Sequence, residues 1–118
     1  MSGVLALLSA SAGTAFSVVA SNVSETDSGF AASGTVATST SPGTTLTGGT
    51  ASYTYAWTKF SGSSVPAVSS ATAQNPSWSG TVLDGVPEIA VWRVTVTDAA
   101  GAIAFYNITV TLIWGNLA

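Results

Sequence analysis

The sequence predicts an all-β protein that forms a single antiparallel β-sandwich, and three observations support this fold class. The 118 residues fit one domain with one core. Residues 53–59 and 88–97 alternate apolar and polar side chains with the two-residue period of a β-strand. Stretches rich in Gly, Pro, Ser and Asp, which favour turns, separate the segments rich in β-branched and aromatic residues.

The N-terminal half of the expected sandwich begins with a strand at residues 15–20, where aromatic and β-branched side chains gather. Residues 21–34 are expected to form a loop, because their Asn, Ser, Thr and Asp side chains favour turns and bonds to the local backbone. Two short β-prone pieces follow at residues 34–40 and 44–47, on either side of a Pro-Gly turn. Either of them can be the inner strand.

Two further strands carry most of the expected core. In the strand at residues 53–59 the aromatic side chains share one face, and in the strand at residues 88–97 the apolar side chains at even positions do so. We expect both faces to point to the core of the sandwich. Between these strands, residues 61–81 are expected to be mostly loop, with short strands near residues 65–68 and 77–79.

A long final strand is expected at residues 102–113. Ile103 and Phe105 occupy one phase of this strand, whereas the apolar residues from Ile108 onward occupy the other. Because a shift of phase inside a strand is typical of a β-bulge, we predict a bulge at Tyr106–Asn107. Residues on the inward phase of the strands form the predicted core: Tyr55, Trp57, Trp92, Val94, Val96, Ile108 and Val110.

The composition excludes several classes of function. Lys59 and Arg93 are the only basic residues, and the formal net charge is −3, so the protein has no positive field to bind nucleic acid. The chain has no Cys and no His, which excludes disulfides, zinc sites built from nitrogen or sulfur ligands, and His-based catalysis. Charged residues make up 6% of the chain, so small and uncharged polar residues must form most of its surface.

Five carboxylates are the remaining candidates for chemistry, and they lie mainly in expected turns: Glu25, Asp27, Asp84, Glu88 and Asp98. A glycosidase needs two carboxylates fixed a few ångströms apart around a cleft, and the sequence gives no sign of such a pair. Calcium binding at residues 25–27, or around Asp84 and Glu88, lacks the dense ligand spacing of a calcium loop. We therefore predict that the protein is not an enzyme and has no catalytic, cofactor-binding or metal-binding residues.

The N-terminal residues 1–14 are expected to form an arm, and residues 15–118 the sandwich. The apolar run at residues 4–8 and the small residues after it resemble a secretion signal, but the basic residues that open such signals are missing. The run is also far shorter than the roughly 20 residues needed to span a membrane. We expect the arm to lie on a neighbouring subunit, because chain ends are ordered when they are tied into a sheet or docked on a partner.

The middle of the chain resembles a known type of β-sandwich. Residues 48–50, Gly-Gly-Thr, and residues 53–57, Tyr-Thr-Tyr-Ala-Trp, look like the start of the third strand in PKD-like and related immunoglobulin-like repeats of bacterial surface and phage virion proteins. Residues 88–94 are similar to the acidic-x-Ala-x-Tyr-x-Cys strand of immunoglobulin domains. In this comparison Trp92 takes the tyrosine place and Val94 the cysteine place.

Residues 94–101 resemble the last hairpin of PKD-like domains, and the whole resemblance covers residues 44–112. The sequence departs from the immunoglobulin pattern because it has no inter-sheet disulfide and replaces the corner tyrosine by Trp92. The indole N–H of this residue can still donate a hydrogen bond. The resemblance implies a scaffold without chemistry of its own, in a virion or on a cell surface.

The role expected from these observations is assembly. An isolated sandwich protects its edge strands with charges or Pro, and this chain has few charges, so we expect other subunits to cover its edges. Apolar and aromatic residues outside the expected core are the interface candidates: Val4, Leu5, Leu7, Leu8, Trp78, Trp114 and Leu117.

The leading interpretation is a non-enzymatic bacteriophage virion structural protein, either a capsid decoration protein or a minor structural subunit that stabilises the particle or displays an immunoglobulin-like domain. Its expected partners are capsid or tail subunits and further copies of itself, with no nucleic acid and no membrane. Two alternatives stay open. One is a secreted bacterial adhesin or carbohydrate-binding module whose aromatic platform includes Trp78. The other is a phage tail or fibre-associated subunit that binds a receptor such as a glycan.

Overall fold

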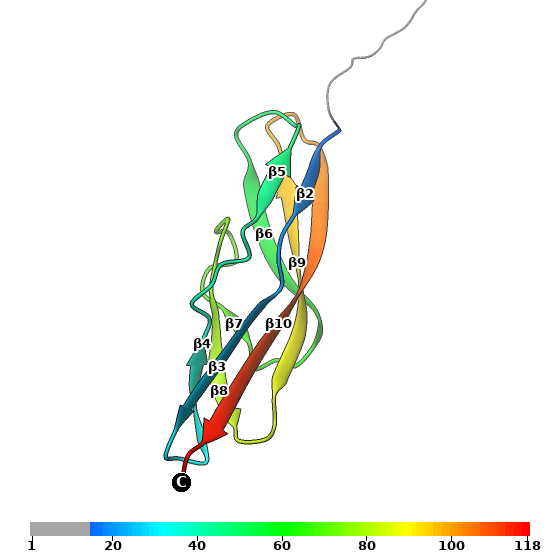
Figure 1. Cartoon of the computed structure of the whole chain (residues 1–118). Coiled ribbons are helices and arrows are strands. Elements are labelled where there is room, and N and C mark those ends of the chain that lie inside the picture. The colour runs from blue at the N-terminus through cyan, green and yellow to red at the C-terminus, as the bar shows by residue number, and fades with distance from the viewer. Residues whose placement is uncertain (1–14) are drawn as a thin grey trace, which may run out of the picture.

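The computed structural model describes residues 15–118, and this part of the chain consists of strands and loops without a helix. Its strands follow in the order β2 (Ser17–Val19), β3 (Val23–Gly29), β4 (Ser33–Ala37), β5 (Thr45–Thr47), β6 (Thr54–Gly62), β7 (Ala67–Val68), β8 (Trp78–Leu83), β9 (Glu88–Thr97) and β10 (Ile103–Asn116). They build an elongated sandwich in which β10 is the longest strand (Figure 1). The expected arm at residues 1–14, with Val4, Leu5, Leu7 and Leu8, lies outside the described residues.

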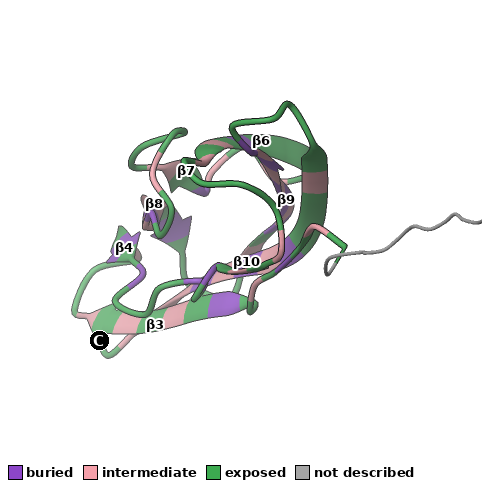
Figure 2. Ribbon diagram, turned by 90° about the horizontal axis from the view of Figure 1, so that it is seen from above, coloured by how far each residue is buried: buried purple, intermediate pink, exposed green. Residues whose placement is uncertain are grey.

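Two sheets face each other, and a two-stranded ribbon lies at one end. Strands β3, β10, β9 and β6 form a four-stranded sheet in that order, and β4, β8 and β7 form a three-stranded sheet. The ribbon pairs β2 with β5 (Figure 1). All pairings are antiparallel except that of β3 with β10. Seen from above, the strands enclose a buried centre (Figure 2), which confirms the predicted all-β sandwich.

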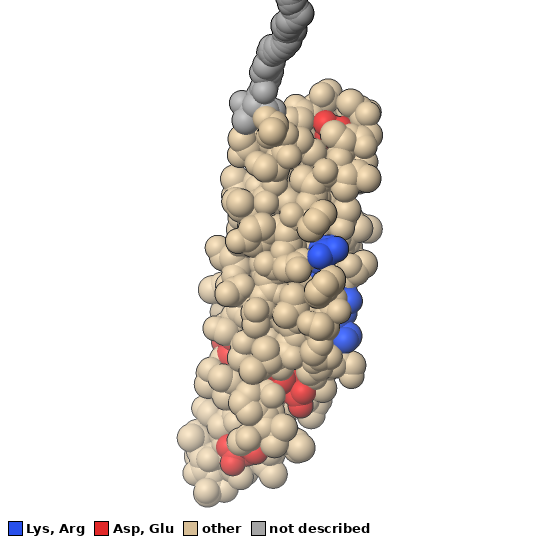
Figure 3. Space-filling model, turned by 90° about the vertical axis from the view of Figure 1, so that its right-hand side faces the viewer, with Lys and Arg blue, Asp and Glu red and all other residues tan. Residues whose placement is uncertain are grey.

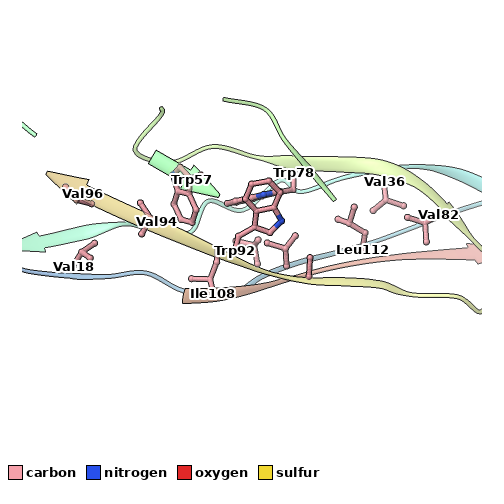
Figure 4. Packing of buried hydrophobic residues seen from close by; sticks show 13 residues of the cluster. Val18, Val36, Trp57, Trp78, Val82, Trp92, Val94, Val96, Ile108 and Leu112 are labelled. Carbon is pink, nitrogen blue, oxygen red and sulfur yellow. The ribbon is translucent and has the colours of Figure 1, made fainter. Parts of the chain in front are cut away.

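The core lies between the two sheets and centres on three tryptophans. Trp78 of β8 packs against Trp57 of β6 and Trp92 of β9, with ring centroids 5.2 and 5.9 Å away in edge-to-face arrangement (Figure 4). This is a geometry that aromatic rings favour, because the positive edge of one ring meets the negative face of another. Tyr55 is half-buried against this core, and the other residues expected there are buried: Trp57, Trp92, Val94, Val96, Ile108 and Val110.

The prediction of a loop at residues 21–34 is wrong, because half of this stretch is strand β3 and its last two residues begin β4. β3 pairs in parallel with the C-terminal half of β10, from Val23 opposite Val110 to Gly29 opposite Asn116. The buried Val23 faces the core, and the exposed positions of β3 are Ser and Thr. The local sequence favours a turn, but the backbone pairing that β10 offers outweighs this weak preference.

The predicted bulge at Tyr106–Asn107 is also wrong, because the register of β10 does not shift anywhere along its pairing with β9. Ile103 and Phe105 lie on the outer face of the sheet, where they are exposed. The strand is regular and carries apolar residues on its outer face near the start and on its inner face farther along, which in the sequence looks like a change of phase. The irregularity of this sheet lies in β6 instead, between Lys59 and Ser61.

The edge strands are better protected than the low charge of the sequence predicts. β3, at one edge of the four-stranded sheet, carries Glu25 and Asp27 on the same face as its buried Val23. β6, at the other edge, has the irregularity between Lys59 and Ser61, and β7 has only two residues. Inward-pointing charges, bulges and very short strands all oppose pairing with another chain. Three edge strands therefore carry features that oppose pairing, and coverage of the edges by other subunits stays a prediction.

Candidate interaction surface

Trp78, expected at an interface, is 0% exposed and belongs to the core, so that expectation is wrong. β8 pairs with β4 on one side and β7 on the other, and Trp78 points from it toward the four-stranded sheet. The backbone N–H of Trp78 donates a hydrogen bond to Thr38 Oγ1 at 3.0 Å. The sequence could not predict that Trp78 points inward, because it is flanked by serines and no regular alternation of apolar and polar residues surrounds it.

Trp114, the second aromatic candidate, is half-buried and anchors the turn between β3 and β4. Its ring lies over Gly29 and Gly34, where an added Cβ would meet ring atoms. Its Nε1 donates a hydrogen bond to the Ala31 carbonyl at 2.9 Å. Leu117 is exposed near the same turn, where its backbone N–H donates to the Gly29 carbonyl at 2.6 Å. Leu117 therefore keeps most of its side chain free for a partner, whereas Trp114 has a structural role.

A different surface, which sequence reasoning missed, lies on the outer face of the four-stranded sheet. Phe60 of β6 and Phe105 of β10 flank Arg93 of β9, whose guanidinium carbon lies 4.5 and 4.4 Å from the two ring centroids. Phe60, Phe105 and the neighbouring Ile103 are 57%, 59% and 64% exposed. We call Phe60, Arg93, Ile103 and Phe105 the aromatic face.

The register of three strands brings the aromatic face together. Arg93 lies opposite Asn107 in the pairing of β9 with β10, and its Nε donates a hydrogen bond to Asn107 Oδ1 at 2.9 Å. Phe105, two positions earlier on β10, points to the same side of the sheet. Phe60 is the residue at which the register of β6 shifts. Stacking of a guanidinium on aromatic faces is a cation–π contact, so the three side chains hold one another in place.

Both cations of the protein are held by neutral oxygens. Lys59 Nζ donates to the Gly62 carbonyl at 3.0 Å, and Arg93 Nε donates to the Asn107 side chain. Figure 3 shows the cations near the middle of the molecule and carboxylates toward both ends. Because neutral partners do not cancel a full charge, the aromatic face is locally positive on a protein whose net charge is −3.

A second exposed apolar group lies at the end of the sandwich where β10 terminates. The turns β3–β4 and β8–β9 meet there, since the backbone N–H of Asp84 donates to the Ala32 carbonyl at 2.9 Å. Asp84 Oδ1 accepts a hydrogen bond from the backbone N–H of Asn116 at 3.1 Å. Phe30, in the first of these turns, is 80% exposed. Asp84 and the exposed apolar residues of this end form what we call the acidic tip: Phe30, Leu83, Asp84, Val86 and Leu117.

Two of the carboxylates considered for catalysis or calcium, Glu25 and Glu88, make structural hydrogen bonds. Glu25 Oε1 accepts from the backbone N–H and hydroxyl of Ser39, and Glu88 Oε1 accepts from the Ser63 hydroxyl. The described residues form no pocket and no cluster of three or more possible metal-ligating side chains. Within residues 15–118 no helix has the length and apolarity required to cross a membrane.

These features define the fold as an immunoglobulin-like β-sandwich similar to that of PKD domains. The solution structure of the PKD domain from human KIAA0319 is similar, with a TM-score of 0.51, 13% sequence identity, and coverage of 92% of this chain and 96% of that chain. No family model matches the chain, and no curated protein matches its sequence. At this identity the likeness shows the fold, which confirms the resemblance found in residues 44–112.

Proposed function

We propose that the protein is a non-enzymatic structural subunit of a bacteriophage virion, an immunoglobulin-like domain that decorates the capsid or serves as a minor structural component. The aromatic face carries this proposal, because the rings of Phe60 and Phe105 are more than half exposed there. Exposed apolar groups that gather on one face of a soluble domain are typical of surfaces that bind a partner. Docking on a neighbouring virion protein would remove these rings from water.

The aromatic face has the composition and the rigidity of a binding hot spot. Aromatic residues and Arg are enriched at protein interfaces. The strands hold Phe60 and Phe105 before any partner binds, and the guanidinium of Arg93 fixes the distance between their rings. Little side-chain freedom is therefore lost on docking. A domain that binds only the assembled particle stabilises the assembled state by mass action.

The proposed partners are capsid or tail subunits together with further copies of this chain, and the proposed location is the virion. The low charge supports an assembled state. With 6% charged residues, the surface presents few groups whose removal from water would oppose docking.

The alternative of a free adhesin or carbohydrate-binding module depends on an exposed aromatic platform for sugars. Trp78, expected to belong to that platform, is buried. The rings of Phe60 and Phe105 each have one face covered by the guanidinium of Arg93. These observations favour a protein partner over a sugar, and a receptor-binding tail subunit would use the same aromatic face.

Particles purified from a host that carries the gene test the proposal. Antibody labelling in electron micrographs and peptide mass spectrometry should find the chain on the particle at a fixed ratio to the major capsid or tail protein. For a variant with both Phe60→Ser and Phe105→Ser, the number of copies per particle should fall about tenfold or more, because truncation of aromatic hot spots removes much of the binding energy.

Val19→Ser is the matched control, since Val19 is 52% exposed on β2, outside the aromatic face. Circular dichroism should show that both variants are folded. Recovery of the wild-type chain only in the free medium or on cell surfaces would overturn the virion assignment. Normal incorporation of the double Phe variant would overturn the role of the aromatic face.

A further inference from the structure

The aromatic face and the acidic tip are chemically complementary. The aromatic face surrounds the guanidinium of Arg93 with exposed apolar side chains. The acidic tip surrounds the carboxylate of Asp84 with exposed apolar side chains. Each surface is therefore apolar with one charge, and the two charges have opposite sign.

The two surfaces lie far apart on one sandwich. Phe105 is near the start of β10, whereas the acidic tip lies at the end of this strand, near Asn116. A strand rises about 3.3 Å per residue, so roughly 36 Å of β10 separates them. One copy therefore cannot place its own tip on its own aromatic face, and a contact between the two surfaces must join two copies.

We propose that the acidic tip of one copy binds the aromatic face of a second copy, with the Asp84 carboxylate next to the Arg93 guanidinium and the apolar side chains of the tip on the two phenyl rings. This contact is heterologous, so it produces a row or a closed ring of copies. A two-fold dimer through the aromatic face would instead set Arg93 against its own copy, and like charges repel. The inference deepens the proposed docking role and rests on it only in treating the aromatic face as a binding surface.

The chemistry of the guanidinium suits this contact. Arg93 uses Nε to bind Asn107 Oδ1, and a guanidinium has further N–H donors that can bind both oxygens of one carboxylate. Asp84 uses Oδ1 to bind the backbone of Asn116, and a carboxylate has further lone pairs that can accept. A contact of this kind weakens at high salt, because ions screen charges that stay partly exposed.

Sedimentation velocity of the purified full chain tests the inference without any virus particle. The wild-type chain should associate increasingly with concentration, and more weakly at high salt. Arg93→Glu and Asp84→Lys should each weaken association about tenfold or more, because each sets like charges together. A chain carrying both substitutions should associate more strongly than either single variant, since attraction returns and the net charge is restored, although the stacking of Arg93 on the two rings is lost.

A mixture of the two single variants should also associate, because every tip then finds a face of opposite charge. The N-terminal residues 1–14 contain no charged side chain, so association through them would not respond to either reversal. Arg93→Gln, which removes the charge but keeps hydrogen-bonding capacity, should weaken association in a chain that stays folded by circular dichroism.

Three results would overturn the inference: a wild-type chain that stays monomeric at all concentrations, single reversals that leave association unchanged, or a double reversal that associates no better than the single variants. A monomeric chain that still enters particles through its aromatic face would leave the proposed function standing. A chain that associates but is absent from particles would support the contact between copies and contradict the proposed virion function.

Discussion

The carboxylate of Asp98, directly after β9, accepts a hydrogen bond from the backbone N–H of Thr50 at 2.9 Å. The same carboxylate accepts from the backbone N–H groups of Ala102 and Ala100 at 2.8 and 3.0 Å. One side chain thus ties the loop before β6 to the turn between β9 and β10. Burial raises the pKa of Asp98, but the backbone donors lower it by more, so the net pKa lies below its ordinary value.

Asp98→Asn should lower the melting temperature clearly. The amide keeps one acceptor oxygen, and its NH₂ group would face a backbone N–H that now has no acceptor. Thermal unfolding followed by circular dichroism measures the effect. Asp84→Asn is the matched control, because the structure gives the Asp84 carboxylate one backbone donor, from Asn116. Equal melting temperatures for Asp98→Asn and the wild type would contradict the structural role of this carboxylate.

The contribution of Asp98 should depend on pH in one direction. An unfolded Asp has a pKa of about 3.9, and the pKa in the folded chain is lower, so the carboxylate stabilises the fold above about pH 4. This stabilisation is lost as the pH falls through the folded pKa. The difference in melting temperature between the wild type and Asp98→Asn should therefore shrink below about pH 4. A difference that grows toward acidic pH would show that the sign is wrong.

Trp78→Ala should destabilise the fold by about 3–5 kcal/mol, because it removes the central ring of the core and leaves a cavity. Urea unfolding measures the change in the free energy of unfolding. Phe105→Ala is the comparison on the surface and should cost about 1 kcal/mol or less, mainly the lost contact with Arg93. Similar costs for the two substitutions would contradict the central position of Trp78.

The strands at residues 53–59 and 88–97 could be predicted because each buries one face, so its apolar side chains alternate with the period of the strand. β3 could not be predicted, since its only strong partner is β10, far along the chain, and its own side chains favour turns. Trp78 could not be placed because its serine neighbours hide its direction. Strands can thus be predicted from the sequence where burial of one face makes apolar and polar residues alternate. They cannot be predicted where pairing with a strand far along the chain determines the structure.

The aromatic face was partly visible in the sequence. Ile103 and Phe105 occupy the phase opposite to Ile108, a pattern that predicts a bulge but marks an exposed apolar face in the structure. That Phe60 and Arg93 lie beside Phe105 depends on the register of three strands, which no local pattern specifies.

Gly34→Ala should destabilise the fold, because its Cβ would overlap the ring of Trp114. The ring must move, which also strains the hydrogen bond from Trp114 Nε1 to the Ala31 carbonyl, and we expect a cost of about 1–3 kcal/mol in urea unfolding. Gly115→Ala is the matched control, because its Cβ would have Ser28 as nearest neighbour, at 3.6 Å. That substitution should be neutral within about 0.5 kcal/mol or slightly stabilising. Equal costs for the two substitutions would contradict the role of Trp114 in anchoring the β3–β4 turn, which places Phe30 at the acidic tip.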